Sequence, residues 1–225
     1  MDIILSSGFL AFASHIGFLR AIEEEGSTVD AICGTSSGAL VGALWAAGMS
    51  TKEIEQELFS RPPLVHLRPN LFFWKGIFSL HKLRARMSQL LPQKFSDLSR
   101  PMGIGVCTSD WKHHMITSGS LVDMVVASCS IPYLFAPTVV DGIAYCDGGA
   151  ADRIGAKSWR SLRSNQSCMV HLVERSRGVN KEEGLDGCRI VRSPRSGASF
   201  WSFGDTNMRI ERTRRNTEEV LLRKG

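Results

Sequence analysis

A serine set between two closely spaced glycines is the first feature of this sequence that could do chemistry. Gly34-Thr35-Ser36-Ser37-Gly38 lies directly after a predicted strand over 29–33 and directly before a predicted helix over 37–47. A sharp strand-to-helix turn needs glycine at both flanks, and it leaves the Ser36 hydroxyl exposed above the sheet. The N-terminal end of the helix stabilises negative charge beside that hydroxyl. The pattern predicts a nucleophilic serine, and the alternative is a simple turn with a helix cap.

A nucleophilic serine needs a group that accepts its proton, and the sequence offers a carboxylate. Asp147-Gly148-Gly149 follows the end of a predicted strand at Tyr145-Cys146, where a side chain can reach the same edge of a sheet as Ser36. Taken alone, an Asp-Gly pair is a common turn former. Together with the serine turn, it makes Asp147 the predicted base for Ser36.

Acyl transfer also needs hydrogen-bond donors that stabilise the oxyanion, the negatively charged oxygen of the tetrahedral intermediate. Ser6-Ser7-Gly8 ends the first predicted strand and leads into a helix that starts at Phe9. Backbone N–H groups of Gly8 and Phe9, together with that of Ser37, are therefore the predicted oxyanion hole.

A Ser-His-Asp triad is the rival mechanism. The order Ser36, Asp147, His171 is the order found in α/β-hydrolases. His171, however, lies inside the apolar run CMVHLV, so we expect a buried strand histidine. His113-His114 is expected in a loop without a metal partner. His15 is expected to be structural, with a supporting role near the oxyanion loop as the alternative.

The elements that must position these residues alternate between strands and helices, which predicts an α/β sandwich around a mostly parallel sheet. The Asp141-Gly142 pair predicts a hairpin, and Ser50 with Glu53 predicts a capping box. Beyond Glu174 the chain becomes polar and its elements are only weakly indicated. The predicted strands are 2–6, 29–33, 102–107, 139–140, 143–145 and 168–173, and the predicted helices are 9–25, 37–47, 51–60, 81–91 and 123–128.

With these motifs in this order, the sequence resembles the patatin-like phospholipase family. The resemblance runs through LSSGFLAFASHIGFLRAIEEEG, VDAICGTSSGALVGALWAAG, FSDLSRPMGIGVCTSD and ASCSIPYLFAPTVVDGIAYCDGGAADR. It implies a three-layer α/β/α sandwich with a mostly parallel central sheet and a Ser-Asp dyad without a catalytic histidine. By position, Ser36 is the nucleophile, Asp147 is the base, and the motif glycines are Gly34, Gly38, Gly148 and Gly149. The implied substrates are lipid carboxylic esters, such as those of phospholipids or lysophospholipids, and no metal or cofactor is needed.

The oxyanion loop departs from the family pattern G-G-G-x-[RK]-G. The aligned residues 7–12 keep only Gly8, Ala11 stands at the basic position, and Phe9 lacks the freedom of glycine to adopt a positive φ. Loss of one oxyanion donor costs about 10²–10³ in rate. The alternative function is therefore a weak or inactive relative that binds a lipid or a partner.

Composition and charge limit what can be expected of the domain organisation and of contact with membranes or nucleic acid. The chain is 43% hydrophobic and 22% charged, and no apolar run reaches the ~20 residues that span a bilayer. We therefore expect a folded catalytic domain over 1–174 and a basic segment over 175–225, packed on that domain or partly flexible. This segment carries 12 Lys/Arg and 7 Asp/Glu, the whole net charge of +5. It predicts a solvated surface, with peripheral contact to an anionic membrane as the alternative, and no nucleic-acid motif accompanies it.

Cysteines and aromatic residues complete the sequence-based expectations. The six cysteines are scattered singly, which predicts buried thiols, a reducing compartment and a cytoplasmic protein. The aromatic stretch 71–78 is predicted to be either a lid that contacts membrane or a segment over the core, and 200–203 invites the same interpretation.

Overall fold

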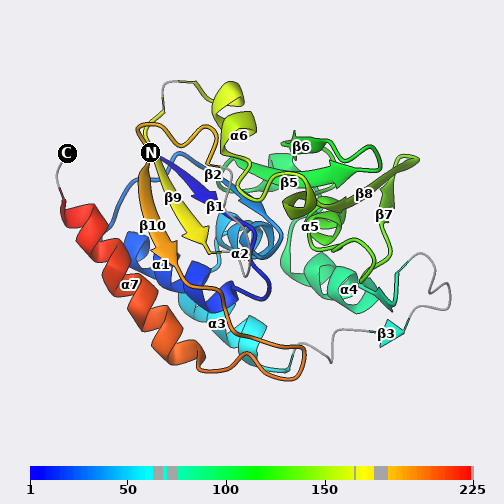
Figure 1. Ribbon diagram of the computed structural model, residues 1–225, viewed down its shortest axis with the longest axis horizontal. Coiled ribbons are helices and arrows are strands. Elements are labelled where there is room, and N and C mark those ends of the chain that lie inside the picture. The colour runs from blue at the N-terminus through cyan, green and yellow to red at the C-terminus, as the bar shows by residue number, and fades with distance from the viewer. Residues whose placement is uncertain (63–67, 70–75, 165, 175–181, 224–225) are drawn as a thin grey trace.

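The central element of the fold is an eight-stranded sheet (Figure 1). The computed structural model describes residues 1–62, 68–69, 76–164, 166–174 and 182–223. The strand order is β10-β9-β1-β2-β5-β8-β7, and β6 also pairs with β5. The strands are β1 Asp2–Leu5, β2 Ala31–Thr35, β5 Met102–Thr108, β6 His113–Ile116, β7 Thr138–Val140, β8 Ile143–Asp147, β9 Cys168–Val173 and β10 Arg189–Ser193, with a separate pair β3 Arg68–Pro69 and β4 Phe78–Ser79.

Most of the sheet is parallel, as the sequence predicted. Strands β10, β9, β1, β2 and β5 pair in parallel, and β6, β7 and β8 add antiparallel pairings at the β5 end. The helices are α1 Phe12–Glu24, α2 Ser37–Ala46, α3 Thr51–Phe59, α4 His81–Leu90, α5 Leu121–Ser128, α6 Ala156–Leu162 and α7 Thr206–Leu222. Short 3-10 turns cover Phe95–Asp97 and Gly148–Ala150. These elements confirm the α/β class.

Side chains that alternate along β1 define the two cores and thus the three layers. Ile3 and Leu5 belong to a large core that helices α1, α2, α5 and α7 complete. Ile4 points to the other face, where Trp159 of α6 and Leu185 form a smaller core. A strand with both faces buried has a continuous apolar sequence, which is why DIIL predicts a central strand.

Two local predictions are confirmed, and one is wrong. Ser50 and Glu53 form the capping box that begins α3. Asp141 and Gly142 adopt φ values of 49° and 79° in the turn between β7 and β8, as the favoured two-residue hairpin requires. His113-His114, expected in a loop, instead lies in β6 and pairs with β5. The short, half-exposed sequence HHMI carries little of the alternation that predicts a strand.

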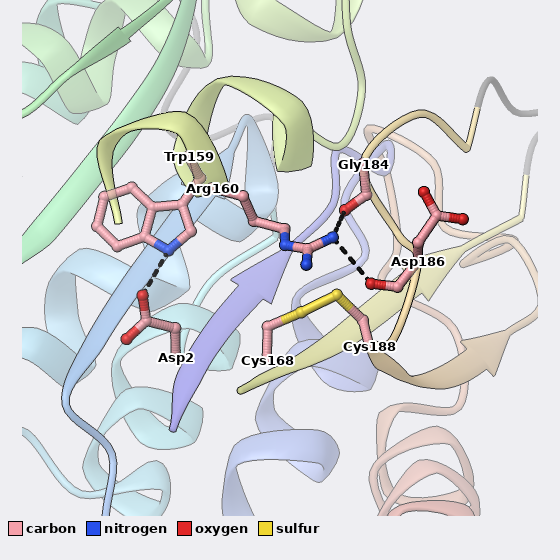
Figure 2. Close-up of a disulfide and its surroundings, with 7 residues drawn as sticks. All are labelled: Asp2, Trp159, Arg160, Cys168, Gly184, Asp186 and Cys188. Carbon is pink, nitrogen blue, oxygen red and sulfur yellow. Dashed lines mark hydrogen bonds between the residues drawn. A yellow bond between two sulfur atoms is a disulfide. The ribbon is translucent and has the colours of Figure 1, made fainter. Parts of the chain in front are cut away.

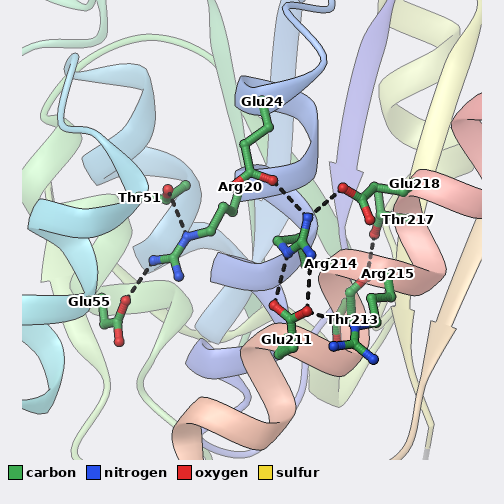
Figure 3. A network of polar contacts seen from close by, with 10 residues as sticks. All are labelled: Arg20, Glu24, Thr51, Glu55, Glu211, Thr213, Arg214, Arg215, Thr217 and Glu218. Carbon is green, nitrogen blue, oxygen red and sulfur yellow. Dashed lines mark hydrogen bonds and ion pairs between the residues drawn. The ribbon is translucent and has the colours of Figure 1, made fainter.

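The C-terminal segment contributes a strand and a long helix that the sequence only weakly indicated. β10 pairs in parallel with β9, and α7 lies along α1 (Figure 1). Part of its charge is paired: Arg214 contacts Glu24 of α1 and both Glu211 and Glu218 of α7 (Figure 3). The division into 1–174 and 175–225 stays a prediction.

A disulfide joins Cys168, at the start of β9, to Cys188, just before β10 (Figure 2). The prediction of six free thiols is wrong for this pair, because the parallel pairing of β9 with β10 brings the two Cα atoms to 5.0 Å across a separation of 20 residues. The four other cysteines are free. The cysteines therefore no longer support the prediction of a reducing compartment. Within the described ranges, no helix is both long and apolar enough to cross a membrane.

The contact between α1 and α7 predicts that one methyl group added at Gly17 will strongly reduce the stability of the fold. A Cβ atom at Gly17 would lie 2.2 Å from the carbonyl oxygen of Ile210, so Gly17→Ala must push the two backbones apart. We expect a loss of about 2–4 kcal/mol in the free energy of unfolding, measured by urea denaturation. Gly42→Ala in α2 is the matched control, since its Cβ meets only flexible side chains at 3.3 Å or more, and it is expected to change stability little. Equal effects of the two variants would contradict this packing.

Candidate active site

The turn between β2 and α2 has the strained geometry of a nucleophile elbow. Ser36 adopts φ 56° and ψ −120°, an uncommon region for a residue with a side chain. A Cβ at Gly34 would lie 2.4 Å from the Gly38 carbonyl oxygen, and a Cβ at Gly38 would lie 2.4 Å from that of Leu5. Both glycines are thus required by close backbone approach. Ser36 and Ser37 are both buried, and both line an apolar pocket.

Ser128 at the end of α5 locks this turn, and sequence reasoning missed it. Its hydroxyl donates to the Gly105 carbonyl oxygen of β5 at 2.6 Å and accepts from the Ser36 N–H at 2.8 Å. The Ser36 carbonyl oxygen accepts from the Leu40 N–H. The strained conformation is therefore held by fixed partners on two neighbouring elements. Ser128 lies 92 residues from Ser36, with nothing local to mark it.

Asp147 ends β8 and faces Ser36 from the neighbouring part of the sheet. It is 4% exposed, and its Oδ1 accepts from the Gly149 N–H at 2.8 Å. Burial raises the pKa of this carboxyl to about 6, although a hydrogen bond from Ser36, the Gly149 N–H and the charge of Arg153 oppose the rise. A carboxylate with such a pKa is suited to take a proton near neutral pH.

The two glycines after Asp147 allow close packing around the carboxylate. A Cβ at Gly148 would lie 2.5 Å from the Gly105 carbonyl oxygen, and one at Gly149 would lie 2.5 Å from Ser7 Oγ. The structure thus brings the D-G-G turn against both β5 and the loop that follows β1.

That loop, residues 6–11, supplies the third group of predicted site residues. In the described part of the chain, the N–H groups of Gly8, Phe9 and Ser37 have no hydrogen-bond acceptor. The left-handed residue of the loop is Leu10, with φ 49°, whereas Phe9 keeps a negative φ. The sequence analysis expected the need for a positive φ to fall on Phe9. It falls on Leu10 instead, because the chain reverses one residue later.

Two side chains hold the loop in place. Nη2 of Arg153 donates to the Ser7 carbonyl oxygen at 2.6 Å, and Ser7 N–H donates to the Arg153 carbonyl oxygen at 2.6 Å. Ser196, after β10, donates from Oγ to the Phe9 carbonyl oxygen at 2.5 Å. The loop is thus anchored by segments distant in sequence, at separations of 146 and 187 residues, which the sequence analysis did not foresee.

The histidine of the rival triad lies elsewhere. His171 is fully buried in β9, where Nδ1 contacts His15 Nδ1 at 2.7 Å and Nε2 contacts Ser193 Oγ at 2.9 Å. His15 Nε2 in turn contacts Ser37 Oγ at 3.2 Å. Both ring nitrogens of His171 are therefore occupied away from Ser36, as expected for a buried strand histidine.

His15 accordingly supports the turn that holds Ser36, through its contact with Ser37. Burial lowers the pKa of His15 to about 3 and that of His171 well below its usual value, so both rings are neutral at pH 7. Because the two Nδ1 atoms face each other, one ring donates and the other accepts. This pair links the start of α2 to β9 without contacting the Ser36 hydroxyl.

An apolar pocket of ≈ 890 Å³, measured to its open mouth, begins at Ser36 and Ser37. The lining is mostly aliphatic and aromatic and includes Phe12, Leu40, Leu83, Met87, Phe135 and Phe203. The ion-paired Glu57 and Arg86 also line it. A long apolar group with its reactive end at Ser36 would fit this lining.

The C-terminal segment closes one side of the pocket. Phe200 contacts Phe9 with ring centroids 5.2 Å apart, and Phe203 contacts Phe59 at 4.9 Å. Trp201, between them, is 74% exposed. In the motif at 200–203, Phe200 and Phe203 therefore line the pocket, whereas Trp201 lies on the surface. The other aromatic stretch, 71–78, lies largely outside the described residues, and of it only 76–78 are described.

The glycine-flanked Ser36 turn lies between a parallel strand and a helix of an α/β sheet, and a comparison with known families finds one match. The family model for patatin-like phospholipase matches residues 3–158. The chain belongs to the patatin-like phospholipase family.

Curated relatives resemble the chain over about three quarters of its length. An uncharacterised NTE family protein of Mycobacterium tuberculosis is 30% identical over 172 residues, 75% of this chain and 48% of that protein. The neuropathy target esterase of Drosophila melanogaster is 42% identical over 172 residues, 72% of this chain and 12% of that protein. The chain therefore spans half or less of the length of these relatives.

Solved structures share the fold at low identity. VipD from Legionella pneumophila superposes with a TM-score of 0.62 at 12% identity, over 98% of this chain and 66% of that one. ExoU from Pseudomonas aeruginosa, solved in complex with SpcU, gives a TM-score of 0.55 at 15% identity, over 98% of this chain and 52% of that one. These likenesses confirm the α/β fold, with its mixed sheet flanked by helices.

Proposed function

We propose that this chain is a serine acyl hydrolase that cleaves carboxylic ester bonds of lipids through Ser36 and Asp147. The observation that carries the proposal is the pairing of a strained elbow serine with a buried carboxylate at the start of an apolar pocket. Neither group alone would suffice, because a serine hydroxyl is a weak nucleophile until a base removes its proton.

The reaction would proceed in two balanced steps. Ser36 Oγ attacks the ester carbonyl carbon as its proton passes to Asp147, and the tetrahedral intermediate expels the alcohol, which takes the proton from Asp147. A water molecule then attacks the acyl-enzyme, gives a proton to Asp147, and releases the fatty acid as the proton returns to Ser36. No metal or redox cofactor is needed for these steps.

The oxyanion of each tetrahedral intermediate would be held by the N–H groups of Gly8, Phe9 and Ser37. Their freedom from other acceptors in the described chain supports this role. The anchors at Ser7 and Phe9 keep the loop fixed before substrate arrives, which is the condition for effective electrostatic stabilisation.

A lipid-binding protein with little or no activity is the second candidate. The altered sequence of the oxyanion loop favours it, since Leu10 holds a conformation that costs a residue with a side chain about 1–3 kcal/mol. Sedimentation with anionic vesicles tests it: wild type and Ser36→Ala would bind equally while neither hydrolyses an ester.

Contact with a membrane surface is part of both candidates. Phe9, Tyr133 and Trp201 are 43%, 82% and 74% exposed. Phe9 lines the apolar pocket, and the other two lie within two residues of lining residues in the sequence. Aromatic side chains in such positions partition into the lipid interface. We propose peripheral contact with an anionic membrane and expect no nucleic-acid partner. A cytoplasmic location likewise stays a prediction.

The direct test is hydrolysis of p-nitrophenyl esters with acyl chains of increasing length. If the apolar pocket holds the acyl chain, kcat/KM rises from acetate to octanoate, and Leu83→Trp reverses that preference because the indole fills the pocket. Leu162→Trp, exposed on α6, is the control and is expected to leave the preference unchanged. A folded wild-type protein that hydrolyses none of these esters would overturn the proposal.

The pKa of Asp147 predicts the pH dependence of the reaction. The carboxyl must be ionised to take the Ser36 proton, and burial raises its pKa to about 6. We therefore expect kcat/KM to be low at about pH 4, to rise through an apparent pKa near 6, and to level off above about pH 7. Initial rates in constant-ionic-strength buffers measure it, and a flat profile over that range would exclude Asp147 as the base.

A further inference from the structure

The oxyanion loop contains a tight turn whose conformation is unfavourable for its sequence. The Ala11 N–H donates to the Gly8 carbonyl oxygen at 3.2 Å, which closes a β-turn over residues 8–11. Leu10, the third residue of this turn, has φ 49°, whereas Phe9, the second, keeps a negative φ. This combination defines a type II turn, in which glycine or asparagine is the usual third residue. The leucine side chain therefore makes this turn costly to form.

A second conformation of the same turn is free of this cost. In a type I turn the peptide unit between the second and third residues is turned over, and both residues have a negative φ. The change would need rotation only at ψ of Phe9 and φ of Leu10, and it would relieve the strain at Leu10. The Phe9 carbonyl oxygen and the Leu10 N–H would then exchange sides of the loop.

Ser196, after β10, contacts the peptide unit that would have to turn over. Its Oγ donates to the Phe9 carbonyl oxygen at 2.5 Å and accepts from the Ala198 N–H at 3.2 Å. The contact with Ala198 uses a lone pair, so the single hydroxyl proton is left for the carbonyl. Phe200 of the same segment packs on the Phe9 ring, with ring centroids 5.2 Å apart. This segment therefore holds both the carbonyl and the side chain of Phe9, although it lies outside the residues 3–158 that match the family model.

We propose that Ser196 is a positioning residue that keeps the turn in the type II form needed for the chemistry at Ser36. The inference rests on the proposed function and gives the C-terminal segment a role in catalysis. Phe9 lines both the apolar pocket that contains Ser36 and a polar cleft that contains Ser196. The bond to Ser196 directs the Phe9 carbonyl oxygen to the cleft side. Turned over, this oxygen would face the pocket side, where the negative end of a carbonyl dipole opposes an oxyanion.

The experiment measures kcat and KM for p-nitrophenyl octanoate in variants of the full chain. Ser196→Ala is expected to lower kcat about 10²-fold and to change KM less than about threefold, because the donors fail only in the transition state. Adding Leu10→Gly to that variant is expected to raise kcat again by at least about tenfold, since glycine adopts a positive φ without strain. Adding Leu10→Ala removes most of the same side chain but keeps the strain, so it should not restore the rate.

Ser199→Ala is the control for the loss of a hydroxyl from this segment. The Ser199 hydroxyl accepts from the N–H groups of Trp201 and Ser202 in its own segment. Its removal is expected to leave both kinetic constants unchanged.

Thermal unfolding tests the same turn without any substrate. With Ser196 present, Leu10→Gly is expected to unfold about 2–4 °C above Leu10→Ala, because alanine bears the cost of a positive φ. In the Ser196→Ala background the turn can adopt the type I form, in which the third residue has a negative φ. The advantage of glycine over alanine is therefore expected to disappear there.

Full activity of Ser196→Ala would overturn the proposal, and so would a loss that Leu10→Gly and Leu10→Ala repair equally or not at all. If wild type hydrolyses no ester, the hydrolase function fails, and the thermal comparison alone decides whether Ser196 holds the turn. An equal advantage of glycine with and without the Ser196 hydroxyl, or no advantage in either background, would refute it.

Discussion

Replacing Ser36 with alanine is expected to reduce kcat/KM for an ester substrate by at least about 10⁴-fold, because the acyl-enzyme cannot form without the hydroxyl. The elbow itself should survive, since the Ser128 hydroxyl bonds the backbone N–H of Ser36 and not its side chain. Rates with p-nitrophenyl octanoate and thermal unfolding together measure both effects.

Ser99→Ala is the control for this variant. Its hydroxyl donates to the Ala46 carbonyl oxygen, away from the pocket, so activity should be unchanged. A Ser36→Ala protein that is folded and keeps more than about a tenth of wild-type activity would show that another nucleophile carries the reaction.

Replacing Asp147 with asparagine is expected to produce the second large effect, a loss of about 10³–10⁴-fold in kcat. The amide can still accept from the Gly149 N–H, so the geometry is retained, but it cannot take the Ser36 proton. Rates at about pH 8, where the wild-type carboxylate is fully ionised, give the clearest measurement. If the Asp147→Asn variant kept activity within about tenfold of wild type, Asp147 would be excluded as the base.

The same substitution is expected to stabilise the fold. Since the pKa of Asp147 is raised from 3.8 to about 6, ionising it in the folded state costs about 3 kcal/mol. The folded state binds the proton more tightly, so this cost is absent below about pH 4 and complete above about pH 6. Asp147→Asn should therefore raise the Tm at about pH 8 and change it little at about pH 4. A gain that does not depend on pH would contradict the raised pKa.

The places of Ser36 and Asp147 in the fold could be predicted because their signals are local. Gly34 and Gly38 mark a turn that only small residues permit, and the apolar runs on either side place it between a strand and a helix. Asp147 is likewise marked by two glycines and by the end of a strand. The order of these motifs matched a family pattern, which supplied the fold and the pairing of two residues far apart in the chain.

The supports of the site could not be predicted because they join distant segments. Ser128, Arg153 and Ser196 are ordinary polar residues in sequence, and only the folded sheet brings them to the elbow and the oxyanion loop. The contact of His15 with His171 has the same origin, since α1 packs over β9.

The C-terminal elements were weakly indicated for a different reason. Helix α7 buries only Ile210, Thr213 and Thr217 in 17 residues, so its buried stripe is narrow and partly polar. Periodicity of apolar residues cannot detect such a stripe. The disulfide was missed because Cys168 and Cys188 have no diagnostic spacing and meet only through the register of β9 and β10.

The central claim is that Ser36 is a nucleophile activated within this fold, and covalent labelling tests it most directly. An alkyl fluorophosphonate reacts with an activated serine oxygen, which forms a bond to phosphorus as fluoride leaves. After incubation and proteolysis, mass spectrometry should find one adduct, on the peptide that contains Ser36, and none in Ser36→Ala. An adduct on a different serine, or no adduct on a protein shown to be folded, would contradict the claim.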